Sequence, residues 1–413
     1  MHGQCRFCSA DLNHIFVDLG TSPPCESQVT PHSMGNSEAF YPLQVFVCDQ
    51  CFLVQLPDSL SPTDIFGTGD YPYFSSYSDS WLEHVRKYAE QTTERFGLNS
   101  DSSVMEIASN DGYLLQYFHQ QGIPVLGIEP ASNCAEAAHE KGIESVVEFF
   151  GCEVAEKIAI ERGKADLLVG NNVLAHVPDI NDFVGGMKRL LAHDGVITME
   201  FPHLVKLVAE VQYDTIYHEH YSYLSLLSVE TIFAEHGLRV FDVRELPTHG
   251  GSLRIYATHT DQNRFPETES LQQLRKTEFD LGLNTLEYYR GFGERVAESK
   301  REILDFLIQA NQDGKSVVGY GAPGKGNTLL NYCGIRTDML SYTVDRNPNK
   351  QGNFTPGTRI PIFEPSHIMD TQPDYVLILP WNLKTEITHQ MKDIAQWGGK
   401  FVVPIPRVEV IEP

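Results

Sequence analysis

Residues 103–129 carry the pattern that most restricts how this chain can fold. A short β-branched and apolar run comes first, and a turn of small and polar residues follows it. A stretch with helical spacing and a second apolar run come next, and the second run ends on Glu129. This order predicts the opening of a nucleotide-binding α/β unit. We expect strand, turn, helix and strand at residues 103–107, 108–112, 113–120 and 125–128.

The turn and the carboxylate of Glu129 favour an adenosine-containing ligand. Small residues let the backbone approach a ligand closely, and Glu129 is placed to accept hydrogen bonds from two ribose hydroxyls. Dinucleotide enzymes share this geometry but carry Gly-x-Gly-x-x-Gly, whereas this turn reads EIASNDG, with one late glycine. S-adenosylmethionine fits better, because it has no pyrophosphate and carboxylates can face its sulfonium. The alternative is an ordinary βαβ unit without a ligand. The candidate cofactor-binding residues are Glu106, Ala108, Asn110, Gly112, Tyr113, Glu129, Pro130 and Asn171.

Size and charge narrow the broad class of the protein. The 413 residues are enough for two or three domains, and the hydrophobic content of 41% is that of a soluble globular protein. The net charge of −24 argues against nucleic-acid partners, because phosphate would be repelled and no basic run compensates. No run approaches the ~20 apolar residues of a membrane span. The first residues lack signal-peptide character, so we expect a cytoplasmic protein.

Two Cys-x-x-Cys pairs predict a structural zinc site. Cys5 and Cys8 form one pair, and Cys48 and Cys51 form the other, with residues 9–47 between them. Four thiolates on two turns are the ligands of a closed tetrahedral site, and a hairpin excursion can accommodate the long spacer. Free cysteines are the alternative interpretation. The remaining cysteines have no partner at metal-binding spacing.

Residues 64–77 are rich in tyrosine, glycine, proline and serine and have neither a helical nor a strand period. Such a loop is typical of a lid that faces a substrate, although tyrosines packing over a domain junction would give the same pattern. An amphipathic helix is expected next, at residues 81–96.

Further apolar strands are expected at 165–170 and 196–201. In an α/β sheet, residues just past the strand ends line the ligand crevice. This rule places Asn171, His176 and His203 near the cofactor.

The stretch from Tyr217 to Tyr223 reads YHEHYSY and is the densest group of titratable side chains. On an extended segment, His218 and His220 would share one side, and Glu219 would point to the other. Acid–base chemistry is the favoured interpretation, because histidine exchanges a proton near neutral pH. Zinc binding by the His-x-His pair and a packing role remain open.

A second strand, glycine-rich turn and helix lies near the C-terminus, at residues 315–332. The turn reads GYGAPGKGN, and Asp345 closes the next strand. This spacing alone would support an NAD enzyme. A glycine-rich turn before a helix suits any phosphate or pyrophosphate, including the diphosphate of a nucleotide sugar.

The Cys-x-x-Cys pairs, the turn EIASNDGYLL, the stretch HEHYSY and the segment GYGAPGKGN occur in this order along the chain. With these motifs, the full length resembles the sugar C-methyltransferase family of deoxysugar biosynthesis. The resemblance implies S-adenosylmethionine-dependent methylation at C3 of a dTDP- or GDP-linked 4-keto-6-deoxy sugar. It also implies that the C-terminal domain helps to hold this substrate and does not bind NAD. One departure is Ala108, where glycine is common in methyltransferases; alanine should be tolerated there if its φ is negative.

The chemistry that this resemblance implies assigns roles to particular residues. A ketone at C4 acidifies the C3 hydrogen, so a base can remove it, and the resulting carbanion attacks the methyl group of the sulfonium. His220 is the leading candidate base, and Tyr217 and Glu219 would position it or stabilise the enolate oxygen. Tyr71 in the lid and His176 beside the methyl donor are further candidates that rest mainly on the resemblance. The expected substrate-binding residues are Gly321, Lys325, Asn327 and Tyr217.

The expected architecture is α/β, with a zinc-binding module at 1–65 and a Rossmann-like methyltransferase domain at 66–245. A second Rossmann-like domain with a helical connector is expected at 246–413. The competing functions are an NAD-dependent nucleotide-sugar oxidoreductase using Gly319–Asp345, an O- or N-methyltransferase of a small molecule, and a non-catalytic scaffold. We expect a monomer or weak homo-oligomer. The sequence does not choose between dTDP and GDP.

Overall fold

The computed structural model describes residues 3–61, 63 and 74–413. They form two compact units, each built from separated parts of the chain. The first unit comprises Met1–Asn13, Cys48–His203 and Tyr221–Tyr288. The second comprises His14–Val47, Leu204–His220 and Tyr289–Pro413. The boundaries at 65 and 245 expected from the sequence stay predictions.

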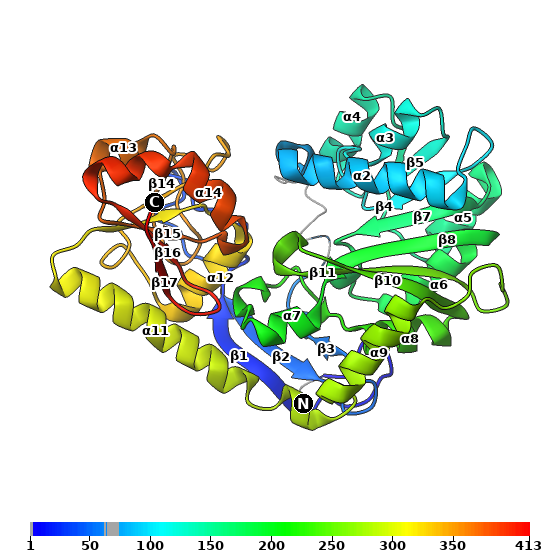
Figure 1. Ribbon diagram of the computed structural model, residues 1–413, viewed down its shortest axis with the longest axis horizontal. Helices are drawn as coiled ribbons and strands as arrows, with labels where there is room; N and C mark the ends of the chain where they lie inside the picture. The colour runs from blue at the N-terminus through cyan, green and yellow to red at the C-terminus, as the bar shows by residue number, and fades with distance from the viewer. Residues whose placement is uncertain (1–2, 62, 64–73) are drawn as a thin grey trace. The chain divides into compact units, whose positions relative to one another are not determined.

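A seven-stranded sheet forms the centre of the first unit, in the order β10-β11-β8-β7-β4-β5-β6 (Figure 1). The strands from β8 to β6 pair in parallel, whereas β11 is antiparallel to both β8 and β10. The strands are β4 (Val104–Ile107), β5 (Val125–Ile128), β6 (Ser145–Val146), β7 (Ala165–Asn171), β8 (Leu191–Pro202), β10 (Leu238–Leu246) and β11 (Ser252–His259). The predicted α/β sheet is confirmed, and its antiparallel edge was not foreseen.

Helices cover both faces of this sheet (Figure 1). They are α2 (Asp79–Phe96), α3 (Leu115–Gln120), α4 (Ser132–Glu140), α5 (Cys152–Arg162), α6 (Ile180–Leu190), α8 (Leu226–Glu235) and α9 (Glu269–Leu281). The Ser78 side chain caps the start of α2 by accepting from the backbone N–H of Trp81, and Gly97 ends the helix in the left-handed conformation. Val85 and Tyr88 of α2 and Phe118 of α3 are buried in the core, and burial of the Val85 and Phe118 side chains contributes about 1.5–3 kcal/mol each.

The second unit contains a six-stranded sheet in the order β14-β13-β12-β15-β16-β17, which is parallel except for β17. An antiparallel hairpin of β1 (His14–Ser22) and β2 (Tyr41–Val47) belongs to the same unit and supplies the predicted excursion between the cysteine pairs. The sheet strands are β12 (Val317–Tyr320), β13 (Thr343–Val344), β14 (Ile362–Phe363), β15 (Tyr375–Ile378), β16 (Lys400–Val403) and β17 (Glu409–Ile411). The helices include α7 (Leu204–Ala209), α11 (Phe292–Gln312), α12 (Gly324–Cys333), α13 (His367–Thr371) and α14 (Lys384–Gln390).

Within the described part of the chain, no helix combines the length and the apolar character needed to cross a bilayer.

Candidate functional site

The predicted nucleotide-binding turn lies at the carboxyl end of β4, next to the carboxylate that follows β5. One oxygen of Glu129 accepts the backbone N–H of Asn110 at 2.8 Å, and the other accepts that of Ala131 at 2.8 Å. Burial raises the pKa of Glu129, and the two N–H donors oppose this rise. Each carboxylate oxygen can accept a further hydrogen bond. Glu129 therefore shapes the turn and still has the capacity to accept from ribose hydroxyls.

Ala108 does not meet the condition of a negative φ. Its φ is +56°, and its N–H donates to the backbone oxygen of Ile128 at 2.8 Å. This hydrogen bond ties the start of the turn to β5, and the chain then has to reverse within a few residues. Asn110 (φ +49°) and Gly112 (φ +72°) also adopt positive φ. Glycine takes this conformation without the steric cost that alanine carries.

Ala108→Gly is therefore expected to change stability little. Relief of left-handed strain favours the variant by about 1 kcal/mol, whereas the more flexible unfolded chain opposes it by about 0.5–1 kcal/mol. Urea unfolding should give a free energy within about 0.5 kcal/mol of the wild type. Ala89→Gly inside α2 is the matched control and should lose at least 1 kcal/mol, because glycine disfavours a helix and leaves a small cavity. A large loss in Ala108→Gly would contradict the strained conformation.

Polar groups buried at the same edge suit a cationic, adenosine-containing cofactor. Burial raises the pKa of Glu106 well above its usual range, although the Tyr113 hydroxyl opposes the rise. Asn171, at the end of β7, donates to that hydroxyl at 3.4 Å. Asp111 pairs with Lys141 at 3.0 Å through one oxygen, and its other oxygen is buried with no hydrogen-bond partner among the described residues. The edge thus holds several buried polar groups, which suit a ligand with hydroxyls and a positive charge. That these residues bind S-adenosylmethionine stays a prediction.

A polar cluster at the ends of β8 and β11 was missed by the sequence interpretation. Glu200 is fully buried and pairs with Arg254, with His84 at 3.0 Å, and with the Thr248 hydroxyl at 2.9 Å. Burial works to raise the pKa of Glu200, but the charge of Arg254 and the hydrogen bond from His84 outweigh it and hold the pKa at about 2. The available signal was a single carboxylate inside the apolar run VITMEF.

Aromatic rings continue this cluster toward the turn. Trp81 stacks on His84 with ring centroids 5.0 Å apart, and it lies 6.1 Å from Tyr113 and 5.3 Å from His249. The His249 ring contacts the Asn172 amide at 3.1 Å. Asn172 and His249 both have positive φ, at +54° and +55°. Strain held on two contacting polar residues at a strand edge is typical of a functional site.

The other residues predicted from strand ends have different surroundings. His176 ends the short 3₁₀ turn Leu174–His176 directly after β7, at the same edge of the first unit. His203 is a buried core residue whose ring bonds Glu278 at 2.8 Å, and Glu278 also caps the first N–H groups of α8. That His203 lies near the cofactor stays a prediction, and the structure shows its Nε2 paired with Glu278. Tyr71 and residues 64–73 of the predicted lid lie outside the described residues.

The Tyr217–His220 segment is a turn and not the extended strand expected from the sequence. The His220 N–H donates to the Tyr217 carbonyl at 2.9 Å, which brings the two rings to a centroid distance of 4.1 Å. His218 instead packs against Tyr41, so the expectation that His218 and His220 share a side was wrong. A reverse turn places residues i and i+3 together, whereas a strand pairs i with i+2.

The hydrogen bond of the His220 ring defines its neutral tautomer. Nδ1 lies 2.8 Å from the Thr215 carbonyl oxygen, which can only accept. The proton therefore sits on Nδ1, and in the neutral ring Nε2 carries the lone pair. The side chain is 6% exposed. A buried imidazole with a fixed tautomer has the properties of a general base.

Glu219 and His220 have different hydrogen-bond partners. One carboxylate oxygen of Glu219 accepts from the Cys25 thiol at 3.6 Å. The neighbouring Glu26 pairs with Lys350 at 2.9 Å. Burial and the charge of Glu26 raise the pKa of Glu219 from 4.5 to about 7, against the opposing effect of Lys350. Glu219 can therefore carry a proton near neutral pH.

Glu219→Gln is expected to alter how stability depends on pH. A carboxyl group whose pKa is raised in the folded state binds more protons when folded, so folding weakens as pH rises between about 4.5 and 7. This rise in pKa corresponds to a change of about 2–3 kcal/mol in the free energy of unfolding. The range is set low because the Glu219 side chain keeps some accessible surface. The stability advantage of Glu219→Gln over the wild type should grow by this amount between pH 4.5 and 8 in urea unfolding. Exposed Glu235→Gln should show no such trend, and parallel curves for Glu219→Gln would refute the shift.

The glycine-rich turn after β12 has the predicted strand–turn–helix geometry. Gly321 has a φ of +89°, and a Cβ there would come within 2.5 Å of Pro380. The Asp345 carboxylate accepts the N–H groups of Ala322 at 2.7 Å and Asn347 at 2.8 Å. Asn327 is buried and donates to the Cys25 carbonyl at 2.6 Å. Glycine here is a packing requirement, and Asn327 already has a partner within the unit.

Lys325 lies among polar groups from the ends of two neighbouring strands. Its ammonium donates to Asn382 at 2.9 Å and lies 5.1 Å from the centroid of the Trp381 ring. The Trp381 indole donates to Asp214 at 2.6 Å. Burial lowers the pKa of Lys325, and the charge of Asp214 opposes this. These groups sit between β12 and β15, where the strand order reverses and ligands of α/β sheets bind.

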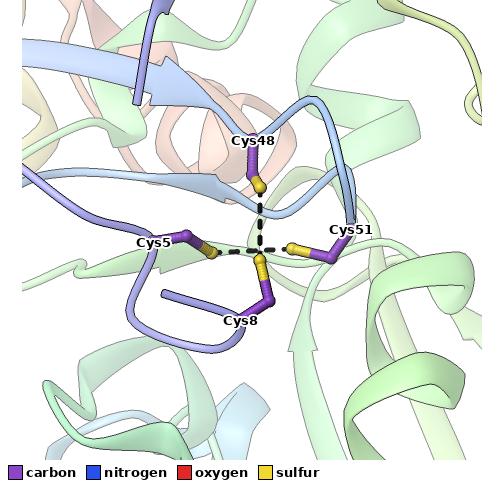
Figure 2. Close-up of side chains that lie close together, drawn as sticks. All are labelled: Cys5, Cys8, Cys48 and Cys51. Atoms are coloured by element: carbon purple, nitrogen blue, oxygen red, sulfur yellow. Dashed lines mark hydrogen bonds between the residues drawn. The ribbon is translucent and has the colours of Figure 1, made fainter. Parts of the chain in front are cut away.

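The four predicted metal ligands converge on one point (Figure 2). The sulfurs of Cys5 and Cys51 lie 3.5 Å apart, as do those of Cys8 and Cys48, and all four lie within 4.8 Å of one another. Zn–S bonds of about 2.3 Å in a tetrahedron place sulfurs about 3.8 Å apart, so the set fits zinc.

Each cysteine pair forms the same turn. Ser9 and Phe52, the residues after each second cysteine, adopt φ near +60°, and their N–H groups donate to the carbonyls of Cys5 and Cys48. Since all four positions of the tetrahedron are filled by thiolates, the site is structural.

Comparison with known proteins places family models along most of the chain. A "Putative zinc binding domain" matches residues 5–66, a "Methyltransferase domain" matches 81–243, and a "C-methyltransferase C-terminal domain" matches 247–406. The chain is 38% identical over 408 residues to C-methyltransferase NovU from Streptomyces niveus, covering 99% of this chain and 96% of NovU.

Two solved structures resemble part of the chain. A protein from Pyrococcus horikoshii, PH0226, is 14% identical and covers 48% of this chain and 97% of its own, with a TM-score of 0.38. Magnesium protoporphyrin IX methyltransferase from Synechocystis, with bound SAH, is 13% identical and covers 43% of this chain and 83% of its own, with a TM-score of 0.35. Likenesses at this level carry no argument about this site.

Proposed function

Because this chain belongs to the C-methyltransferase family, we propose that it methylates C3 of a 4-keto-6-deoxy sugar linked to dTDP or GDP. It is an S-adenosylmethionine-dependent methyltransferase with a structural zinc module. The proposal adds the substrate and the roles of individual residues to this assignment.

The observation that carries the proposal is the fixed tautomer of His220. Transfer of a methyl group to carbon requires a carbon nucleophile, and therefore removal of a C–H proton. A ketone at C4 makes the C3 hydrogen acidic, and the lone pair on Nε2 of His220 accepts it. The electrons move toward the C4 oxygen to give an enolate. His220 is thus the proposed general base.

Tyr217 and Glu219 are proposed to stabilise that enolate. The Tyr217 ring packs against the His220 ring and presents a phenol that can donate a hydrogen bond. Glu219 can carry a proton near neutral pH and so can also donate. Tyr71 and His176 are further proposed catalytic residues. Gly321, Lys325 and Asn327 are proposed to line the sugar-nucleotide site, with Lys325 as its cationic group.

The cofactor is proposed to lie at the carboxyl edge of β4 and β5. Glu129 would accept from its ribose hydroxyls, and the turn from Glu106 through Gly112 would approach it through the backbone, with Tyr113, Pro130 and Asn171 nearby. When bound, S-adenosylmethionine supplies an electrophilic methyl group on a cationic sulfonium.

The decisive experiment incubates the purified enzyme with S-adenosylmethionine and a panel of dTDP- and GDP-linked 4-keto-6-deoxyhexoses. Mass spectrometry should show a gain of one methylene with loss of deuterium from labelled C3. A methylated product that keeps C3 deuterium would indicate O- or N-methylation and overturn the proposal. Turnover only with added NAD, read from nicotinamide absorbance, would indicate an oxidoreductase instead.

A further inference from the structure

Arg6 stands between the first two zinc ligands and reaches away from the metal site. Its side chain is 7% exposed although it carries a permanent charge. One terminal nitrogen donates to the Pro178 carbonyl at 2.7 Å. The other donates to the Leu56 carbonyl at 2.5 Å and to the Asp58 carboxylate at 3.0 Å. The guanidinium thus joins two segments that are far apart in sequence.

The backbone of Arg6 is itself fixed to the metal site. Its N–H donates to the Gln55 side chain at 2.9 Å, and the Gln55 amide donates to the Cys5 sulfur at 3.1 Å. Asn181, in the first turn of α6, donates to the Phe7 carbonyl at 2.9 Å. The position of Arg6 therefore depends directly on the turn that holds Cys5 and Cys8.

Pro178 closes the short loop that carries His176. The same loop is held at Ala175, whose carbonyl accepts the N–H of Tyr221 at 2.8 Å. The Tyr221 carbonyl in turn accepts the N–H of Leu56 at 3.0 Å, and the Arg6 guanidinium lies 5.2 Å from the centre of the Tyr221 ring. Arg6 and Tyr221 thus form hydrogen bonds both to the loop at residues 173–178, which carries His176, and to residues 56–60.

We propose that Arg6 is a positioning residue that couples the zinc site to the His176 loop, so that metal binding sets the geometry for methyl transfer as well as the local fold. This inference rests on the proposed function through the role of His176. Arginine is required because its planar fork reaches several acceptors at once, whereas a lysine ammonium at the same place cannot span them.

The test uses full-length Arg6→Lys, with Arg6→Gln as a second variant and Arg86→Lys as the control. Arg86 lies on the exposed face of α2, where it forms ion pairs with Glu83 and Glu90. We measure zinc per chain, the dissociation constant for S-adenosylmethionine, kcat and KM, and amide hydrogen exchange of residues 173–178 and 56–60.

In Arg6→Lys we expect one zinc per chain, cofactor affinity within twofold of the wild type, KM within threefold, and kcat lowered at least tenfold. Exchange should rise in residues 173–178 and 56–60 and stay unchanged in the α2 core. A kcat within twofold of the wild type, or a loss of kcat that follows a loss of zinc, would overturn the inference. If the wild type methylates none of the sugars, the proposed function fails on its own. The exchange measurement then decides for or against Arg6, since it needs no acceptor.

Discussion

His220→Asn is expected to lower kcat for methyl transfer by about 10³-fold or more, because the variant has no group that can accept the C3 proton. The asparagine amide can still donate to the Thr215 carbonyl, so the turn should keep its shape. S-adenosylmethionine should bind with an affinity within twofold of the wild type, since the residues proposed to contact it belong to the first unit. Calorimetry and product mass spectrometry measure the two quantities separately.

Exchange of the C3 hydrogen in heavy water, without the methyl donor, isolates the deprotonation step. The wild type should wash deuterium into C3, and His220→Asn should not. His218→Asn is the matched control, because His218 lies in the same turn but packs against Tyr41. Near-normal turnover of His220→Asn would instead move the base to Tyr71 or His176.

Removal of zinc is the second change expected to have a large effect. Structural zinc sites supply roughly 10–16 kcal/mol of apparent binding energy in small peptides, and most of that is folding energy. Extraction with a chelator should therefore unfold residues 3–13 and 48–55, seen as lost protection in hydrogen exchange. Activity should fall with metal content and return on adding zinc.

Cys48→Ser tests the same site without a chelator. The buried Cys48 supplies one of four ligands, and its loss should reduce zinc to well below one per chain. Cys134→Ala is the control, because Cys134 is equally buried in α4 but stands apart from the four-cysteine cluster. Full zinc content in Cys48→Ser would show that the metal does not need this thiolate.

Local periodicity predicted the elements of the first unit well. Strand β5 has the expected bounds, and the bounds of β4, β7 and α2 differ from the expected ones by one or two residues. The four cysteines were found because metal ligands need only type and spacing to be recognised. These features depend on near neighbours in sequence, which a single chain displays directly.

Hydrogen bonds of irregular turns and contacts between residues distant in sequence decided the features that the sequence did not predict. The turn at Tyr217–His220 exists because a backbone hydrogen bond and the Thr215 carbonyl reorganise a stretch whose alternating pattern favours a strand. Glu200 forms a buried ion pair with Arg254, which lies 54 residues further along the chain. Ala108 has a positive φ because of a contact with Ile128. Periodicity carries no information about such irregular turns or about partners distant in sequence.

The division of the chain into alternating segments has a consequence for its synthesis on the ribosome. The hairpin β1–β2 emerges early, but the six-stranded sheet of its own unit is translated only after Tyr289. The nascent polypeptide must therefore keep this hairpin available while the first unit is being completed. Truncation between residues 203 and 289, or exchange of a contiguous block with a relative, would leave one unit without part of its sheet or without the turn at Tyr217–His220. Recombination of such enzymes should succeed only when the separated segments of a unit are exchanged together.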